Sequence, residues 1–317
     1  MSTETFMMQV SSTTPSPKVG GSVAISSTRY MGFLAGYNNI NTQKVIHSSI
    51  QDFRSFLNSI GINQEKIDQD IINLYLNHLR GRGLRNATYN LKVSNLKKYV
   101  EYMGVRGLTY KTEPIEVYGN MDIIPERDFK AIVHYLSEMK DKPGAKSTRY
   151  LRDFVLFNLF FLTGIRKAEA LSLKFSSIRV QGEGIYYSAR CKGGKEITKP
   201  FPGSLFPLIL LLKKKEMKQK DDHIFTADYN GKKLKLSHFS VNKKLNKYHQ
   251  IVNGKTETVS VHGIRNLSAW NVYKITKDIL KVKEHLNHSN LNTTYKYLAK
   301  MESKKIDYYG EMEKVLA

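Results

Sequence analysis

Three runs near the carboxyl end of the chain decide its fold: Val261-His262-Gly263-Ile264-Arg265, Leu286-Asn287-His288 and Thr293-Thr294-Tyr295-Lys296-Tyr297. They fall in a region of helical periodicity. His262 and Arg265 are three residues apart at the start of a helix, so they share a face. His288 follows a further helix. Tyr295 and Tyr297 are two residues apart and point to different sides of a helix, so only one of them can reach a site shared with His288.

Upstream runs add charged groups to this set. Thr163-Gly164-Ile165-Arg166 ends a long apolar helix, and a turn there can direct the guanidinium of Arg166 out of the core. Arginine binds phosphate through two parallel hydrogen bonds and stays charged at any working pH. Glu169, three residues further on, can hold Arg166 in place. Lys192 lies in a tight turn between two strands, where a lysine can protonate a departing oxygen, and Lys195 of the same turn is an alternative.

Each of these residues also has an ordinary structural interpretation. A lone arginine or hairpin lysine is commonly a surface residue, and a lone histidine or helical tyrosine commonly packs in the core. The histidines could instead bind a metal ion together with Asp278, Glu284 and His285. Their spacing matches no recognised metal motif, so we expect neither a metal ion nor another cofactor. Taken together, the set favours phosphodiester transfer by a nucleophile that the protein itself supplies.

The charge of the chain points to a polyanionic partner. The 317 residues carry a formal net charge of +22. Between Arg190 and Lys255 there are 16 Lys or Arg against five Asp or Glu, which is half of the net excess. No apolar run reaches the length of a membrane span, and no signal peptide is evident. Nucleic acid is therefore the expected partner. The single cysteine, Cys191, excludes a disulfide within the chain and fits a reducing compartment.

Helical periodicity and turn residues predict two domains joined by a linker. Residues 1–28 are rich in Ser, Thr, Gly and Pro and are expected to be a disordered tail. Three helices, the first capped by Asn41 or Thr42, predict a small helical domain over residues 30–104. The aperiodic residues 105–122 are expected to be the linker. Helices then resume, interrupted by three predicted strands at Ser177–Val180, Gly184–Cys191 and Glu196–Pro200, within a larger domain over residues 123–300.

The ordered set resembles the catalytic boxes of the tyrosine recombinases, the family of the phage integrases, Cre and the Xer proteins. The resemblance covers about residues 40 to 300 and is carried by the runs quoted above, from Thr163-Gly164-Ile165-Arg166 to Tyr297. The step of nine residues from His288 to Tyr297 favours Tyr297 over Tyr295 as the nucleophile. Two positions depart from the family pattern. Asn266 stands where many members have a second histidine, and Asn287 where many have glycine.

The resemblance implies a mainly α-helical fold with a small antiparallel sheet in the catalytic domain, and two domains that clamp DNA. It implies a metal- and ATP-independent site-specific DNA recombinase that works through a 3′-phosphotyrosyl intermediate. The expected catalytic residues are Arg166, Lys192, His262, Arg265, His288 and Tyr297, with Glu169 in support. The basic residues expected to contact DNA are Lys195, Lys199, Lys232, Lys243, Lys244, Arg80, Arg82 and Arg85.

The expected partners are double-stranded DNA with specific recombination sites and further copies of the chain in a homotetramer. Residues 301–317 would dock on a neighbouring protomer. The expected location is the cytoplasm, at the nucleoid, or the host cytoplasm if the source is viral. The alternative is a non-catalytic sequence-specific DNA-binding protein or a decayed recombinase, which would keep the charge and the helices without needing all six catalytic residues.

Overall fold

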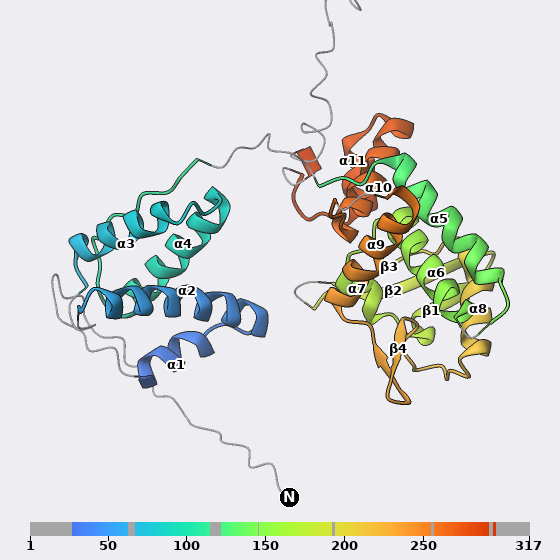
Figure 1. Ribbon diagram of the computed structural model, residues 1–317, viewed down its shortest axis with the longest axis horizontal. Coiled ribbons are helices and arrows are strands. Elements are labelled where there is room, and N and C mark those ends of the chain that lie inside the picture. The colour runs from blue at the N-terminus through green and yellow to red at the C-terminus, as the bar shows by residue number, and fades with distance from the viewer. Residues whose placement is uncertain are drawn as a thin grey trace, which may run out of the picture. The chain divides into compact units, whose positions relative to one another are not determined.

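The computed structural model describes residues 27–62, 67–114, 122–144, 146–191, 194–254, 257–291 and 294–295. The chain divides into two units, unit 1 at residues 1–116 and unit 2 at residues 117–317. Helices dominate both, and among the described residues the strands all lie in unit 2 (Figure 1). This agrees with the predicted fold class. No helix in the described ranges is both long and apolar enough to cross a membrane.

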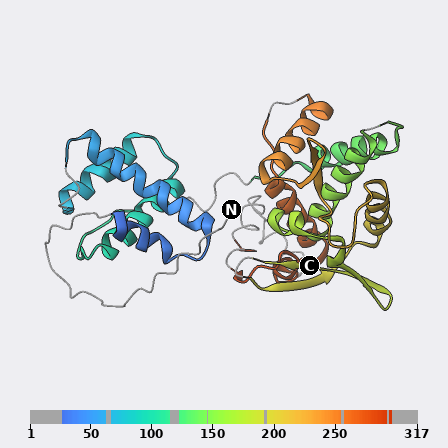
Figure 2. The ribbon, with the colours of Figure 1, turned by 90° about the horizontal axis from the view of Figure 1, so that it is seen from below.

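Four helices make up the described part of unit 1: α1 (Ser27–Ala35), α2 (Ile40–Ser59), α3 (Gln69–Gly81) and α4 (Asn86–Tyr102). Both ribbon views show them as one blue-to-cyan body (Figures 1 and 2). The last three correspond to the three predicted helices. The N-cap of α2 is Asn39, whose side chain accepts hydrogen bonds from the next turn, and the predicted caps Asn41 and Thr42 are its donors.

Helix α1 was not predicted, and its first residues fall inside the expected tail of residues 1–28. Its aromatic residues Tyr30 and Phe33 are buried against Ile50 of α2, Tyr99 of α4 and Met103, which follows α4. The Ser- and Thr-rich composition upstream hides this short apolar stretch, because only the tertiary contacts make it helical. The rest of the predicted tail lies outside the described residues.

The first part of the segment predicted to be a linker, residues 105–122, is packed against unit 1. Val105, Leu108 and Tyr110 pack against the core of α3 and α4. Glu113 accepts a hydrogen bond of 2.7 Å from Arg80, and its amide donates to Asn90 over 2.8 Å. Residues 105–114 therefore belong to unit 1. The absence of a periodic pattern concealed this, because the segment is held by side chains of other elements.

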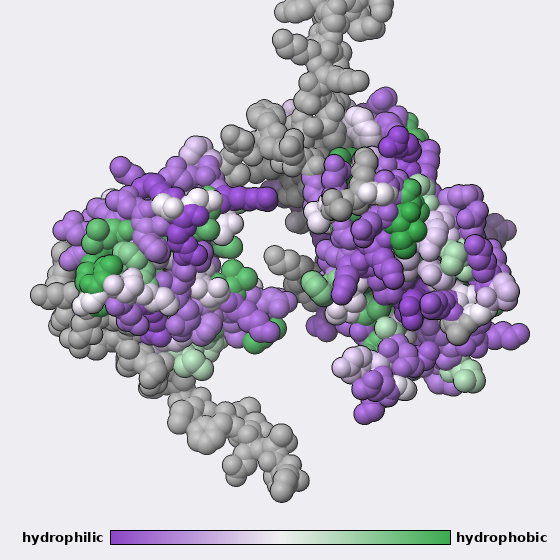
Figure 3. All heavy atoms as spheres, viewed as in Figure 1, coloured by the Kyte–Doolittle hydropathy of each residue, from purple (hydrophilic) through white to green (hydrophobic). Residues whose placement is uncertain are grey.

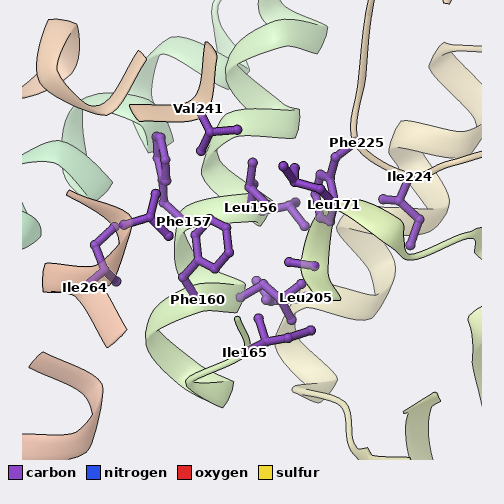
Figure 4. Close-up of a cluster of buried hydrophobic side chains, with 14 of the residues drawn as sticks. Leu156, Phe157, Phe160, Ile165, Leu171, Leu205, Ile224, Phe225, Val241 and Ile264 are labelled. Atoms are coloured by element: carbon purple, nitrogen blue, oxygen red, sulfur yellow. The ribbon is translucent and has the colours of Figure 1, made fainter. Parts of the chain in front are cut away.

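Unit 2 is built around helix α6 (Ser147–Thr163), which packs against α5 (Glu126–Asp141), α8 (Phe206–Lys215) and α10 (Val261–Thr276). Phe157 and Phe160 of α6 are fully buried, and Figure 4 shows them beside Ile264 of α10 and Leu205. Burial of each such ring stabilises the fold by roughly 1.5–3 kcal/mol. The apolar composition of α6 predicted that this helix forms the centre of the larger core, and its buried residues confirm this. The remaining helices are α7 (Lys167–Ser172), α9 (His238–Asn253) and α11 (Ile279–Leu286), with 3-10 turns at Phe175–Ser177 and Gly203–Leu205.

A three-stranded antiparallel sheet lies in unit 2, in the order β1 (Ile178–Gln181), β2 (Gly184–Arg190) and β3 (Glu196–Pro200). These strands match the three predicted ones to within a residue or so at each end. Strand β2 is central, and its Arg190 pairs with Glu196 of β3 next to the connecting turn. The turn predicted to carry Lys192 falls between these two strands, and Lys192 itself lies outside the described residues.

A second hairpin, β4 (Thr226–Tyr229) and β5 (Lys232–Lys235), was predicted only as an interruption between helices. It projects from the body of unit 2 in Figure 1. The residues between the strands are Asn230 and Gly231, with φ values of 51° and 76°. An Asn-Gly pair is the strongest short-range signal for a two-residue hairpin, so the sequence did contain the information. All four residues of β5 are exposed.

Candidate active site

Four of the six predicted catalytic residues line one cavity of unit 2, with a volume of about 380 Å³. They are Arg166, His262, Arg265 and His288. Arg166 precedes α7, His262 and Arg265 lie in α10, and His288 follows α11. The fold therefore brings together side chains that are more than a hundred residues apart in sequence. Lys192 and Tyr297 lie outside the described residues.

Arg166 is positioned by the start of α7. As the N-cap residue, its backbone amide donates to Glu169 Oε2 over 3.0 Å, and its guanidinium donates to Glu169 Oε1 over 3.0 Å. A second guanidinium nitrogen donates to the carbonyl of Asn287 over 3.2 Å. Glu169 is almost fully buried, whereas 38% of the Arg166 side chain remains exposed. Arg166 is therefore fixed in direction while its guanidinium stays open to an anion in the cavity.

Arg265 is the buried member of the pair. One guanidinium nitrogen donates to the carbonyl of Gly164, and another donates to the carbonyl of Leu286 over 2.6 Å. These bonds tie the last turn of α6 to the last turn of α11. Gly164 has φ +58°, and an added Cβ would lie 2.8 Å from Leu286 Cδ2. Glycine is thus needed there, because it permits both the left-handed backbone and the close approach of α11.

His288 is buried, its Nδ1 lies 3.0 Å from Thr294 Oγ1, and Nε2 is the second nitrogen of its ring. Burial, reinforced by Arg265 and Arg166, lowers the pKa of His288 to about 4. Its imidazole is therefore neutral near pH 7, and a neutral imidazole can donate one hydrogen bond to an anion. Desolvation and the charge of Arg265 also lower the pKa of His262, so this ring too is a neutral base near pH 7.

His285, the neighbouring candidate, does not line the cavity that contains Arg166 and Arg265. Its Nε2 lies 2.7 Å from Ser268 Oγ, and it faces a different cavity of about 960 Å³ beside β3 and α11. Burial lowers its pKa to about 4. A metal site with Asp278 and Glu284 was considered and not predicted. Asp278 caps α11, and no three His, Cys, Asp or Glu side chains converge in the described part of the chain.

The two departures from the family pattern have structural roles. Asn287 ends α11 with φ +50°, a left-handed conformation that Asn tolerates better than most residues and that glycine adopts freely. Asn266 donates to the carbonyl of Asp122 over 2.5 Å. The Asp122 carboxylate also accepts from Ser260 Oγ. A Cβ on Gly263 would lie 3.0 Å from that carboxylate, so the segment at Asp122 packs directly on the start of α10.

The basic residues predicted to contact DNA fall into two groups. Four of them have internal partners: Lys199 with the carbonyls of Glu284 and His285, Lys244 with Asp153, Arg80 with Glu113, and Arg82 with Asp52. The partners occupy these cations, and Lys199 and Lys244 are only partly accessible. Arg80 and Arg82 are exposed beside their partners, and the other four are exposed as well: Lys195, Lys232, Lys243 and Arg85. The second group is therefore the better set of candidates for contacts to phosphate.

Comparison with known proteins identifies the class. The sequence pattern of the phage integrase family matches residues 123–304, more than half of the chain. The chain therefore belongs to the phage integrase family, and it is a site-specific recombinase of the tyrosine type. It is 24% identical over 271 residues to tyrosine recombinase XerD of Rhizobium meliloti, covering 83% of this chain and 86% of that protein. It is 29% identical over 225 residues to tyrosine recombinase XerC of Neisseria meningitidis, covering 70% and 72%.

Solved structures share the fold. XerH bound to its difH substrate, in a post-cleavage complex, gives a TM-score of 0.67 at 18% identity and covers 82% of this chain and 76% of that one. A lambda integrase dimer bound to a COC′ core site gives a TM-score of 0.62 at 18% identity and covers 88% and 96%. At this identity the likeness concerns the fold, which agrees with the predicted helical architecture and its small sheet.

Proposed function

We propose that this recombinase cuts and rejoins duplex DNA through a covalent bond between Tyr297 and a 3′ phosphate. The observation that carries the proposal is the cavity in which two guanidinium groups and two neutral imidazoles converge. Two fixed positive charges in a partly buried cavity suit a phosphodiester whose charge grows in the transition state. The alternative of a non-catalytic DNA-binding protein would not require this arrangement.

Arg166, Arg265 and His288 stabilise the phosphoryl oxygens in this proposal. Arg166 is open to solvent on one side and would contact a bound phosphate directly. Arg265 already donates to two carbonyls, and its buried charge acts at short range. His288 donates one hydrogen bond from its neutral ring. Together they replace the hydration that a phosphate loses when it enters the cavity.

Tyr297 and Lys192 complete the chemistry. The Tyr297 oxygen attacks phosphorus, the bond from phosphorus to the 5′ oxygen breaks, and Lys192 gives that oxygen a proton. His262, whose lowered pKa makes it a base, accepts the tyrosine proton or orients the phosphate. A 5′ hydroxyl of a partner duplex then reverses the attack. The phosphotyrosyl bond conserves the energy of the phosphodiester, so the cycle invokes neither ATP nor a metal ion.

The predicted helical domain of residues 30–104, within unit 1, would clasp the duplex together with unit 2. The exposed cations Lys195, Lys232, Lys243 and Arg85 would contact phosphates. Much of the surface of both units in Figure 3 is hydrophilic. A lambda integrase tetramer bound to a Holliday junction shares the fold at a TM-score of 0.57, which supports a homotetramer on DNA. Residues 301–317, outside the described residues, would dock on a neighbouring protomer. The expected location is the cytoplasm, at the nucleoid or in a virus-infected host.

The test is capture of the covalent intermediate. The full chain is incubated with a library of nicked random-sequence duplexes, and adducts that resist SDS are isolated and sequenced to find the site. Wild type should form the adduct, Tyr297→Phe should form none, and Tyr295→Phe, the matched control, should resemble wild type. Loss of the adduct in Tyr295→Phe but not in Tyr297→Phe would reassign the nucleophile. No adduct with any variant, although DNA is bound, would support the non-catalytic alternative.

A further inference from the structure

The side chain of Asn287 makes a contact that its backbone conformation does not require. Its Nδ2 donates to Cys191 Sγ over 3.4 Å. We call this hydrogen bond the latch. The same residue accepts a hydrogen bond from Arg166 through its carbonyl, and Arg166 is in turn held by Glu169. One residue at the end of α11 thus links the start of α7 to the end of β2, across 121 and 96 positions of sequence.

Cys191 sits at the base of the turn between β2 and β3. Its amide donates to the carbonyl of Lys195 over 2.7 Å, and its carbonyl accepts from the amide of Gly194 over 3.1 Å. The hydrogen bonding between the two segments therefore continues past the strands to Cys191. Lys192 follows Cys191 directly in the sequence and lies outside the described residues.

The state of the thiol suits the latch. Burial raises the pKa of Cys191, and so do a hydrogen bond to Glu169 and the negative charge of that residue. The sulfur is therefore protonated near pH 7 and can accept the hydrogen bond from Asn287 while its own proton faces Glu169. Glycine would satisfy φ +50° at position 287 with less strain than Asn does. The side chain thus has a use beyond ending the helix.

We propose that Asn287 is a positioning residue, which holds Cys191, after the end of β2, against the Arg166 side of the cavity and so assists Lys192, the next residue in the sequence, in protonating the leaving oxygen. This inference rests on the proposed function, in which Lys192 is the general acid. Asn287 itself touches no reacting atom. Its effect should therefore appear only in the step that needs a proton from Lys192.

A change of leaving group isolates that step. In a duplex whose scissile 5′ oxygen is replaced by sulfur, the leaving group is a thiolate, which needs no proton because thiols have a pKa of about 8.5. Asn287→Gly keeps the left-handed backbone and the carbonyl that Arg166 binds, and removes only the latch. We expect it to slow adduct formation roughly 3- to 10-fold on the ordinary duplex, the loss of one hydrogen bond, and less than about 2-fold on the sulfur duplex.

Matched variants define the outcome. Cys191→Ala should reproduce the pattern of Asn287→Gly, and Cys191→Ser, which retains an acceptor, should restore most of the rate. Asn230→Gly makes the same change at a left-handed residue of the β4–β5 hairpin and should leave the ratio of the two substrates unchanged. Equal slowing of Asn287→Gly on both duplexes, or no slowing on either, would overturn the inference.

Lys192→Ala separates this inference from the proposed function. If the sulfur duplex rescues Lys192→Ala but not Asn287→Gly, the general acid stands and only the latch is refuted. If it fails to rescue Lys192→Ala, the assignment of Lys192 as the acid is refuted first, and the latch with it. Both duplexes carry the site found by adduct capture, so wild-type cleavage serves as the positive control.

Discussion

Replacing Gly164 with alanine should disturb both the stability of unit 2 and the position of Arg265. The residue has φ +58°, and a left-handed conformation costs an alanine roughly 1–2 kcal/mol. The new Cβ would also lie 2.8 Å from Leu286 Cδ2 and 2.9 Å from His285 Nε2. His285 is held by Ser268, so it cannot yield without losing that contact. Such overpacking costs about 1–3 kcal/mol more. The expected total for Gly164→Ala is therefore roughly 2–5 kcal/mol.

Gly254 supplies a matched control. It also follows a helix of unit 2, with φ +65°, but no described heavy atom would lie within 4 Å of an added Cβ. Gly254→Ala should therefore cost only the backbone component, about 1–2 kcal/mol. The difference between the two variants measures the packing of α11 against the end of α6.

Urea unfolding followed by the fluorescence of Trp270 provides the assay. Trp270 is the only tryptophan of the chain and lies in α10, so the signal reports on unit 2. Because the Gly164 carbonyl accepts from Arg265, adduct formation should also fall by about 10- to 100-fold in Gly164→Ala. Equal destabilisation by both alanines, or a normal cleavage rate in Gly164→Ala, would refute the reasoning.

Three further predictions follow from the charges. His285 and His288 have pKa values lowered to about 4, so the unfolded chain, with histidine pKa values near 6.5, binds more protons between these limits. Their contribution to stability is full above about pH 6.5 and is lost towards pH 4. Lowering the pH from 7 to 5 should therefore reduce the free energy of unfolding by about 2 kcal/mol for each of the two histidines. A urea midpoint that does not change with pH would contradict this. Lys243→Ala should reduce the salt dependence of duplex binding, the slope of log K against log salt, by about 0.9, whereas Lys199→Ala should leave it unchanged, as fluorescence anisotropy can show; equal slopes would reject the division of the basic residues. Glu169→Gln should slow adduct formation about 10-fold, because the guanidinium of Arg166 loses a charged partner, and a rate within 2-fold of wild type would argue against that positioning role.

Local patterns predicted the helices and the three-stranded sheet well. The helical spacing of Ile71, Ile72 and Tyr75 reflects which face packs in the core, and that face is buried as expected. The spacing of His262 and Arg265 likewise predicted one shared face, and both residues line the same cavity. These properties are periodic, so a single sequence contains them.

Contacts between distant segments were harder to predict. Lys244 and Arg80 were predicted to contact DNA, and the sequence did not predict that they also pair with Asp153 and Glu113, which lie 91 and 33 positions away. No local sequence pattern predicts such pairing. The same reason explains why Asp122, which holds the start of α10 through Asn266, was assigned to a linker. Its two contacts exist only after the chain has folded back.

That position of Asp122 has a practical consequence for dissecting the chain. A fragment that begins after Asp122 would leave the side-chain amide of Asn266, a residue that is 2% exposed, without its acceptor. It would also expose the surface at Gly263 on which Asp122 packs. Leaving a buried donor unpaired costs roughly 1–3 kcal/mol, a large share of the stability of a small domain. An autonomous version of unit 2 should therefore start upstream of Asp122, and fragments cut at the visible start of α5 should be poorly stable for a reason unrelated to their chemistry.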